Sequence, residues 1–220
     1  MKENVNIKQI LVVGSGEDFK LEKIKAAAVD SQLIIAGDGG ANILAAAGIF
    51  PDILMGDMDS ISAEILDKIS DKCEIFKYPR EKDPSDSQVC LEKALEYKPQ
   101  KVIFAATTGT YIDHSIANLV NLFQAQRSGT EVEIMTSNSR IFVITPDKPA
   151  KMTGKNGRRF SFFPIEPITG LVMNGFYYHF SSNSLRSWEY SLSNVINEDN
   201  ALLAFESGKG IGILFDENFS

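Results

Sequence analysis

The stretch Ile53-Leu54-Met55-Gly56-Asp57-Met58-Asp59-Ser60 places two carboxylates one residue apart, directly after a short apolar run. An apolar run of this length, bounded by turn residues, is typical of a buried strand, and the pattern over 61–69 is helical. A strand followed by a helix is the repeating unit of an α/β fold. Carboxylates at the end of such a strand suit a hard divalent cation such as Mg²⁺, which takes oxygen ligands. The stretch therefore predicts a strand–helix unit with a cation site beside it, and Ser60 as the cap of the helix.

Strand and helix patterns alternate from residue 10 to about residue 137. Expected strands cover 10–13, 33–36, 53–55, 74–78, 102–106 and 132–135, and expected helices cover 21–29, 41–47, 61–69, 85–97 and 113–127. Such alternation predicts a mostly parallel sheet. The strands are continuous apolar runs, which is the pattern expected when helices cover both faces of the sheet. We therefore expect a three-layer α/β domain over residues 1–146.

The pattern changes after Pro146, where helical periodicity disappears. Short apolar or alternating runs, separated by Gly, Asn and Ser, cover 159–163, 170–172, 175–180, 201–206 and 210–215. Short strands at this spacing are typical of an all-β domain. We expect a second, all-β domain over residues 147–220.

The composition excludes several classes of protein. With 220 residues, 44% of them hydrophobic and 23% charged, the chain is long and apolar enough for a globular core. Its formal net charge of −7 argues against nucleic-acid binding, which needs a basic face. No apolar run approaches the ~18 residues that a membrane span needs, and the N-terminus lacks the apolar region of a signal peptide. Cys73 and Cys90 have no metal-ligand spacing, so we expect two reduced thiols and a cytoplasmic location.

Polar segments follow four consecutive expected strands, at 38–42, 57–59, 83–86 and 108–114. A single Asp in such a place is commonly a helix cap. Four of them would meet along the edge where open α/β sheets bind ligands. Glycines at 14, 16, 39 and 40 would let a phosphate approach the backbone, although the chain lacks the Gly-Lys-Ser/Thr ending of a Walker A loop. Together these segments predict a nucleoside triphosphate handled through its metal ion.

These segments resemble, in order and over nearly the whole chain, the motifs of thiamine pyrophosphokinases. The matching stretches are Asp38-Gly39-Gly40-Ala41-Asn42, 51–60, Lys82-Asp83-Pro84-Ser85-Asp86, 113–119 and Ser191-Leu192-Ser193-Asn194. The resemblance implies an N-terminal α/β domain that binds ATP and magnesium, and a C-terminal β-sandwich that binds thiamine and forms a homodimer. It also implies a reaction, in which the diphosphate of ATP moves to the thiamine hydroxyl to give thiamine diphosphate and AMP.

The resemblance also implies roles for individual residues. Asp57, Asp59 and Asp86 are the expected catalytic metal ligands, with Asp86 orienting the thiamine hydroxyl as the alternative. The other expected binding residues, for nucleotide, phosphate or thiamine, are Asp38, Gly39, Asn42, Lys82, Asp83, Asp113, His114, Ser191, Ser193 and Asn194. Plainer roles remain open for several of them: Asp38 could tie down its own turn, Asp113 could cap its helix, and His114 could be structural. Trp188 either stacks on thiamine or fills the sandwich core.

One motif departs from the family pattern, which has Gly-Gly-Arg before the Asp-His pair. Here Gly109-Thr110-Tyr111 takes that place, so a phosphate contact would fall to Lys82, Arg80 or another cation. Two further functions therefore stay open beside the thiamine enzyme. One is a related pyrophosphokinase acting on a hydroxymethyl-pterin, and the other is a non-catalytic protein that binds thiamine or nucleotide.

Overall fold

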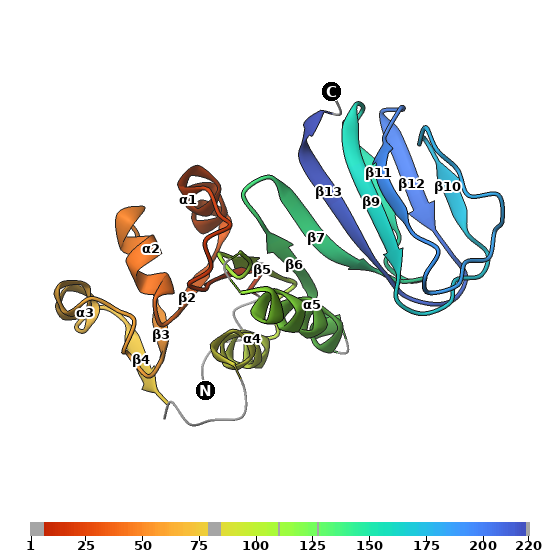
Figure 1. The fold of residues 1–220 in the computed structure, drawn as a ribbon. Coiled ribbons are helices and arrows are strands. Elements are labelled where there is room, and N and C mark those ends of the chain that lie inside the picture. Colours follow the sequence, from red (N-terminus) through yellow and green to blue (C-terminus); the bar gives the residue numbers. More distant parts are fainter. Residues whose placement is uncertain (1–6, 79–84, 110, 127, 219–220) are drawn as a thin grey trace. The chain divides into compact units, whose positions relative to one another are not determined.

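The computed structural model describes residues 7–78, 85–109, 111–126 and 128–218. The chain forms two compact units, Met1–Ser137 and Asn138–Ser220 (Figure 1). The division falls before a strand at Ser139–Ile144, which the sequence pattern did not predict, rather than at residue 146. Each unit is therefore described on its own.

The first unit alternates strands and helices along its whole length. Its elements are β1 (Gln9–Val13), α1 (Leu21–Asp30), β2 (Leu33–Gly37), α2 (Gly40–Ala46), β3 (Ile53–Gly56), α3 (Ala63–Ile69), β4 (Glu74–Lys77), α4 (Asp86–Glu96), β5 (Lys101–Ala105), α5 (Ile112–Gln126) and β6 (Glu131–Met135). The strands run in the order β6-β5-β1-β2-β3-β4, and every neighbouring pair is parallel. The predicted parallel sheet is confirmed.

Helices cover both faces of this sheet. Figure 1 shows α1, α2 and α3 along one face and α4 and α5 along the other. The chain order explains the split, because the strands step outward from β1 to β4 and then return to β5 on the far side of β1. The point of reversal lies between β1 and β5, which is where open α/β sheets usually bind ligands. The covered strands are apolar throughout, and Ile10, Leu11 and Leu54 are fully buried.

Helices α3 and α4 both begin after a serine that caps the first turn, but only α4 begins within one residue of its predicted start. Helix α4 begins as predicted, with Ser85 as its cap, accepting a hydrogen bond from the backbone N–H of Gln88 at 3.2 Å. Helix α3 begins at Ala63, later than predicted, and its cap is Ser62, whose hydroxyl oxygen accepts from the N–H of Ile65 at 3.4 Å. The prediction of Ser60 as the cap was wrong, because Ser60 belongs to the loop that carries the acidic residues.

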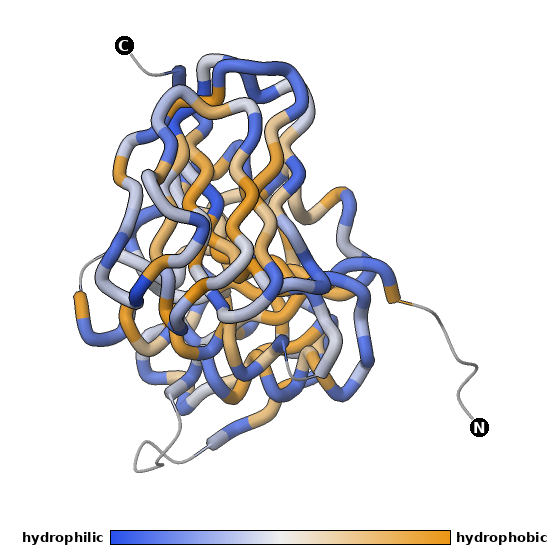
Figure 2. The backbone as a smooth tube through the Cα atoms, turned by 90° about the vertical axis from the view of Figure 1, so that its right-hand side faces the viewer, coloured by the Kyte–Doolittle hydropathy of each residue, from blue (hydrophilic) through white to orange (hydrophobic). Residues whose placement is uncertain are grey.

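The second unit is an antiparallel β-sandwich. Its strands are β7 (Ser139–Ile144), β8 (Ala150–Thr153), β9 (Arg158–Pro164), β10 (Val172–Asn174), β11 (Ser191–Val195), β12 (Asn200–Ala204) and β13 (Gly210–Asn218). They form one sheet in the order β11-β9-β13-β7 and another in the order β10-β12-β8. Both sheets contribute side chains to one apolar core around Phe160, Phe162 and Phe176. Figure 2 shows the hydrophobic stretches along the strands and the hydrophilic ones at the turns.

The sandwich also differs from the sequence prediction in detail. The run 175–180, predicted as a strand, makes only an isolated bridge between Phe176 and Ile196. Gly175 has a φ of +75°, which breaks the extended conformation at the start of that run. Strands β7, β8 and β11 were not predicted. The mixed polar composition of β8 and β11 gives no continuous apolar run, whereas β7 contains the apolar run 141–144, which was not assigned to a strand.

The structure bears on the sequence predictions for membrane spans and for the two cysteines. No helix in the described ranges is long and apolar enough to cross a membrane. Cys73 and Cys90 are both free thiols, as predicted, and Cys90 is buried beside Gly37.

Candidate active site

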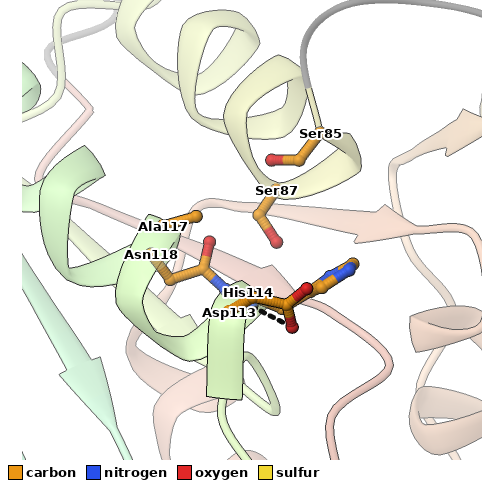
Figure 3. Close-up of a pocket in the computed structure, with 6 residues that line it drawn as sticks. All are labelled: Ser85, Ser87, Asp113, His114, Ala117 and Asn118. Carbon is orange, nitrogen blue, oxygen red and sulfur yellow. Dashed lines mark hydrogen bonds between the residues drawn. The ribbon is translucent and has the colours of Figure 1, made fainter. Parts of the chain in front are cut away.

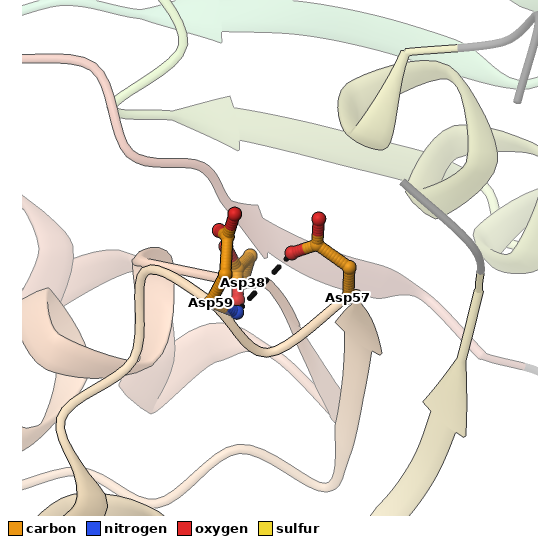
Figure 4. Close-up of side chains that lie close together, drawn as sticks. All are labelled: Asp38, Asp57 and Asp59. Atoms are coloured by element: carbon orange, nitrogen blue, oxygen red, sulfur yellow. Dashed lines mark hydrogen bonds between the residues drawn. The ribbon is translucent and has the colours of Figure 1, made fainter. Parts of the chain in front are cut away.

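The predicted site residues of the first unit gather in two places at the carboxyl edge of its sheet. One is a cavity between the N-terminal ends of α4 and α5 (Figure 3). The other is a group of three carboxylates that follows β2 and β3 (Figure 4). Lys82 and Asp83, together with Arg80, lie outside the described residues.

The carboxylate group consists of Asp38, Asp57 and Asp59. Each offers one oxygen atom, and these oxygens all lie within 4.8 Å of one another. Parallel pairing explains the meeting, because Gly37 lies opposite Met55 in the sheet and both strands end at the same edge. Asp86, predicted as the third metal ligand, is an exposed residue at the start of α4 and is not part of this group. Its role as a ligand stays a prediction.

Unusual backbone conformations bring the three carboxylates together. Gly56 has a φ of +151°, and a Cβ atom there would lie 2.8 Å from the Cβ of Asp38. Only glycine therefore lets the end of β3 pass so close to Asp38. Met58 is left-handed with a φ of +68°, which turns the chain between the half-buried Asp57 and the exposed Asp59. The N–H of Asp59 then donates to Oδ1 of Asp57 at 3.2 Å.

Asn42 and Ser60 hold this acidic loop in place. The Nδ2 of Asn42 donates to the carbonyl of Ser60 at 2.8 Å, and its Oδ1 accepts from the N–H of Ser62 at 3.1 Å. Ser60 donates through its N–H to Oδ2 of Asp38 at 3.2 Å, and through its hydroxyl to Oδ1 of Asp59 at 2.9 Å. In this structure Asn42 positions the loop. Ser60 links two carboxylates, a role that sequence reasoning missed although Ser60 directly follows the Asp-x-Asp pair.

Asp38 is the buried member of the group. It is only 6% exposed, and its Oδ1 is a buried oxygen without a hydrogen-bond partner. Burial raises the pKa of the Asp38 carboxyl, the negative charges of Asp57 and Asp59 raise it further, and hydrogen bonds from Ser60 offset part of the rise. A buried carboxylate oxygen beside two more carboxylates is poorly solvated unless a cation joins them. The three oxygen donors therefore fit a hard divalent cation, which takes carboxylate ligands.

Replacing Asp38 by Asn is expected to stabilise the protein in metal-free buffer at pH 7. Asn keeps the acceptor for the N–H of Ser60 and removes a buried negative charge that the hydrogen bonds from Ser60 compensate only in part. A gain of about 1 kcal/mol would raise the midpoint of thermal unfolding by about 2–4 °C in a chain of this size. Thermal unfolding with a chelator present measures it, and a lower midpoint for the variant would contradict the expectation.

The glycine turns have a packing reason that needs no ligand. The N–H of Gly14 donates to the carbonyl of Ala105 at 2.9 Å, and that of Gly16 to the carbonyl of Ala106 at 2.7 Å. A Cβ on Gly40 would lie 2.1 Å from the carbonyl oxygen of Val13. The two N–H groups of the first turn are thus used within the chain rather than directed at a phosphate. Gly39, which is buried, stays a predicted binding residue.

The cavity has a volume of about 270 Å³ and is lined by Ser85, Ser87, Asp113, His114, Ala117 and Asn118. Its floor is fixed by Asn118, a buried side chain whose Nδ2 donates to the carbonyl of Thr107 at 2.7 Å. Asn121 donates to Oδ1 of Asn118 at 3.3 Å and holds its amide in place. Whole small ligands usually occupy about 300–1,000 Å³, so this cavity suits one part of a ligand.

The cavity has polar walls and lies at two helix starts, where unpaired N–H groups favour negative charge. Asp113 lies one residue inside α5, so it is not the cap of that helix, and its Oδ1 accepts from the N–H of His114 at 2.9 Å. The rings of His114 and Tyr111 lie 5.6 Å apart. Among the described residues that line the cavity, His114 carries the only basic side chain.

In the second unit, Asn194 is fully used by the chain itself. Its Oδ1 accepts from the N–H groups of Tyr178 and Val195 at 3.0 and 2.8 Å, and its Nδ2 donates to the carbonyl of Tyr178 and the hydroxyl of Ser191 at 2.8 and 3.3 Å. An amide side chain can make four such bonds, so none is left for a ligand. In this structure Asn194 positions Ser191. Ser193 is left-handed, with a φ of +51°, where the pairing of β11 with β9 shifts register.

Trp188 does not fill the sandwich core. Its side chain is 66% exposed, and the guanidinium carbon of Arg186 lies 4.9 Å from the centre of its ring. The alternative in which Trp188 fills the sandwich core was wrong, because Trp188 is exposed in the loop before β11. The exposed indole ring of Trp188 is therefore able to stack on a cationic group, as it does on the guanidinium of Arg186.

A doubly wound parallel sheet with possible oxygen ligands for a cation at its carboxyl edge defines an α/β protein with its ligand site at that edge. The family model described as thiamin pyrophosphokinase, catalytic domain, matches residues 24–134, just over half of the chain. The chain belongs to the thiamin pyrophosphokinase family.

Individual relatives agree with this assignment. The chain is 27% identical to the thiamine pyrophosphokinase of Bacillus subtilis (strain 168) over 214 residues, which cover 94% of this chain and 98% of that one. It is similar in fold to a crystal structure of thiamine pyrophosphokinase from Bacillus subtilis, with a TM-score of 0.84, 24% identity, and 96% and 100% of the two chains covered. A structure of a family protein from Enterococcus faecalis matches with a TM-score of 0.80 and 22% identity, over 96% and 100% of the chains.

Proposed function

We propose that this chain is a thiamine pyrophosphokinase that transfers the diphosphate of ATP to the hydroxyl of thiamine. The products are thiamine diphosphate and AMP. Family membership supports the proposal. The observation that carries it is the group of three carboxylates at the carboxyl edge of the parallel sheet, where a metal-bound triphosphate would be expected.

The proposed reaction is an in-line displacement at the β-phosphorus of ATP. The hydroxyl oxygen of thiamine forms a bond to that phosphorus, and the bond from the phosphorus to the oxygen shared with the α-phosphate breaks. AMP leaves with that oxygen and its electron pair, and the proton of the hydroxyl passes to solvent or to a nearby carboxylate. A carboxylate of ordinary pKa, about 4, is a weak base for an alcohol, so positioning and charge are expected to supply most of the effect.

We propose that Asp57 and Asp59 hold Mg²⁺, with Asp86 either completing the set or orienting the thiamine hydroxyl. Mg²⁺ would supply charge neutralisation on the phosphate oxygens as AMP leaves. The chain's own part is to hold the carboxylates in one geometry. Ser60 and Asn42 do this through the four hydrogen bonds that tie the acidic loop to Asp38, Asp59 and α2.

We propose that the cavity at α4 and α5 takes part of the anionic substrate. Hydroxyls from Ser85 and Ser87, helix starts and His114 line it, and these are groups that bind phosphate oxygens. Asp113, which also lines the cavity, keeps its predicted role as a binding residue. Lys82 and Asp83 keep their predicted roles from the sequence alone.

We propose that the sandwich unit supplies the contacts to thiamine. Ser191 and Ser193 are the proposed hydrogen-bonding residues, and Asn194 acts by holding Ser191. Trp188 offers an exposed ring to the positively charged thiazolium, in the way that it now meets Arg186.

We also propose that the protein is a homodimer. Helix α5 carries exposed Ile112, Ile116 and Val120, which are spaced four residues apart and so share one face. Exposed apolar side chains in a row are typical of protein interfaces. Light scattering on the purified protein tests the assembly, and a monomer at all concentrations would contradict it. The two free cysteines support the cytoplasm as the proposed compartment.

One assay tests the proposed reaction against its alternatives. The purified protein is incubated with Mg-ATP and either thiamine or a hydroxymethyl-pterin, and AMP is measured. We expect AMP with thiamine and none with the pterin. AMP only with the pterin would assign the chain to the other pyrophosphokinase reaction, and thiamine binding without AMP would make it a non-catalytic binder.

A further inference from the structure

The carboxylate of Asp18 joins three loops at the carboxyl edge of the parallel sheet. Asp18 lies between β1 and α1 and is partly buried. Its Oδ2 accepts a hydrogen bond from the hydroxyl of Thr108 at 3.3 Å, and its Oδ1 accepts from the backbone N–H of Ser137 at 3.1 Å. Thr108 follows β5 and Ser137 follows β6. One side chain therefore holds the loops of three strands together.

The main chain of Asp18 also contacts the loop after β5. The N–H of Asp18 donates to the carbonyl of Thr108 at 3.1 Å. A Cβ atom on Gly109 would lie 3.0 Å from the backbone nitrogen of Asp18, so the two loops pack directly against each other. The segment 107–109 is therefore fastened to the loop after β1 by backbone and side chain together.

The same segment is fastened on its other side to helix α5. Asn118, which lines the floor of the cavity, donates through its Nδ2 to the carbonyl of Thr107 at 2.7 Å. The segment 107–109 thus links Asp18 to the helix whose first turn forms one wall of the cavity (Figure 3). A shift of this segment would move that wall, and small displacements of a binding group strongly change its contacts with a substrate.

We propose that Asp18 is a positioning residue for nucleotide binding, which fixes the cavity wall by holding the segment 107–109 in place. The inference rests on the proposed function, in which the cavity takes part of the anionic substrate, and adds to it a residue that does not touch the substrate. The carboxylates after β2 and β3 are held by Asn42 and Ser60 instead. Asp18 should therefore govern the binding of Mg-ATP and not the chemical step.

The test separates nucleotide binding from turnover in Asp18→Ala. We expect the KM for Mg-ATP to rise about tenfold, because a hydrogen bond to a charged group is typically worth that much. The kcat should stay within about twofold and the KM for thiamine should not change, since only binding of one substrate is affected. Calorimetry with Mg²⁺ and α,β-methylene-ATP, which cannot release AMP, should show the same tenfold loss of affinity without any reaction.

Two further variants distinguish positioning from a general loss of stability. Asp18→Asn should restore most of the affinity, because its amide oxygen can accept from the N–H of Ser137 and its amide nitrogen can donate to the hydroxyl of Thr108. Thr108→Val should weaken binding in part, and should add little when combined with Asp18→Ala, because both remove the same contact. The matched control is Asp30→Ala, an exposed Asp at the end of α1, which should bind nucleotide as the unaltered protein does.

The outcomes distinguish this inference from the proposed reaction. Unchanged nucleotide affinity in folded Asp18→Ala, with AMP still formed from thiamine and Mg-ATP, would overturn the positioning role and leave the proposed function standing. Weaker binding of α,β-methylene-ATP by Asp18→Ala, in a protein that forms no AMP with thiamine, would support the inference and remove the reaction. If Asp18→Ala does not fold, Thr108→Val decides, because it keeps the main-chain bond, and unchanged affinity in it would overturn the role of Asp18. A protein that binds no nucleotide would contradict both proposals.

Discussion

Replacing Asp59 by Asn is expected to lower turnover at least about a hundredfold, since losing one charged group aimed at a transferring phosphate typically costs that much. Asn has the same shape, and Asp59 is an exposed loop residue, so the folded state should be kept. The loss therefore reflects charge at the metal rather than damage to the fold. AMP formation at saturating thiamine and Mg-ATP measures the turnover.

Two controls separate the loss of charge at the metal ion from damage to the fold. Asp67→Asn removes the same charge from the surface of α3, outside the carboxylate group, and should keep full turnover. Circular dichroism should show both variants folded. Near-normal turnover in Asp59→Asn would contradict the proposed role of Asp59 in holding the metal ion.

Replacing Gly40 by Ala is expected to have the largest effect on stability. The added Cβ would lie 2.1 Å from the carbonyl oxygen of Val13 and 2.9 Å from that of Gly14, and these are main-chain atoms that cannot turn aside. The first turn of α2 would have to move away from β1, at a cost of about 3 kcal/mol or more. The thermal midpoint should fall by about 6 °C or more.

Gly48→Ala is the control for this variant. Gly48 has a φ of +75°, but a Cβ there meets nothing within 4 Å. It should cost only the price of a left-handed alanine, about 1–2 kcal/mol. Equal losses in the two variants would mean that the contact with Val13 is not what requires glycine at position 40.

The first unit was predictable because its signals are local and repeat. Each strand is a short apolar run such as Ile53–Met55, and the apolar residues of each helix recur with helical spacing. These local patterns specify the elements without knowledge of the tertiary packing. The sandwich was harder. In β11 (Ser191–Val195) the apolar Leu192 is exposed and the polar Asn194 is buried, so the strand is recognisable only from its pairing with β9.

The candidate site was likewise predictable only where its residues share one local motif. Asp57 and Asp59 were predictable because they share a motif, whereas the meeting of Asp38 with them depends on the register of β2 against β3. The dual role of Ser60 and the saturation of Asn194 depend on contacts between residues distant in sequence. Asp86 was suggested by a family motif and lies at the start of α4, outside this group, so its role as a ligand stays a prediction.

The bonds that join the loops after β1 and β5 have a consequence for how substrate choice can change. The N–H groups of Gly14, Gly16 and Asp18 donate to the carbonyls of residues 105, 106 and 108, so main-chain hydrogen bonds join the two loops at the point where the strand order reverses. Recognition must then come from side chains on the flanking loops and helix starts. Side chains change one codon at a time, so a new acceptor could be selected by point substitutions without rebuilding the scaffold.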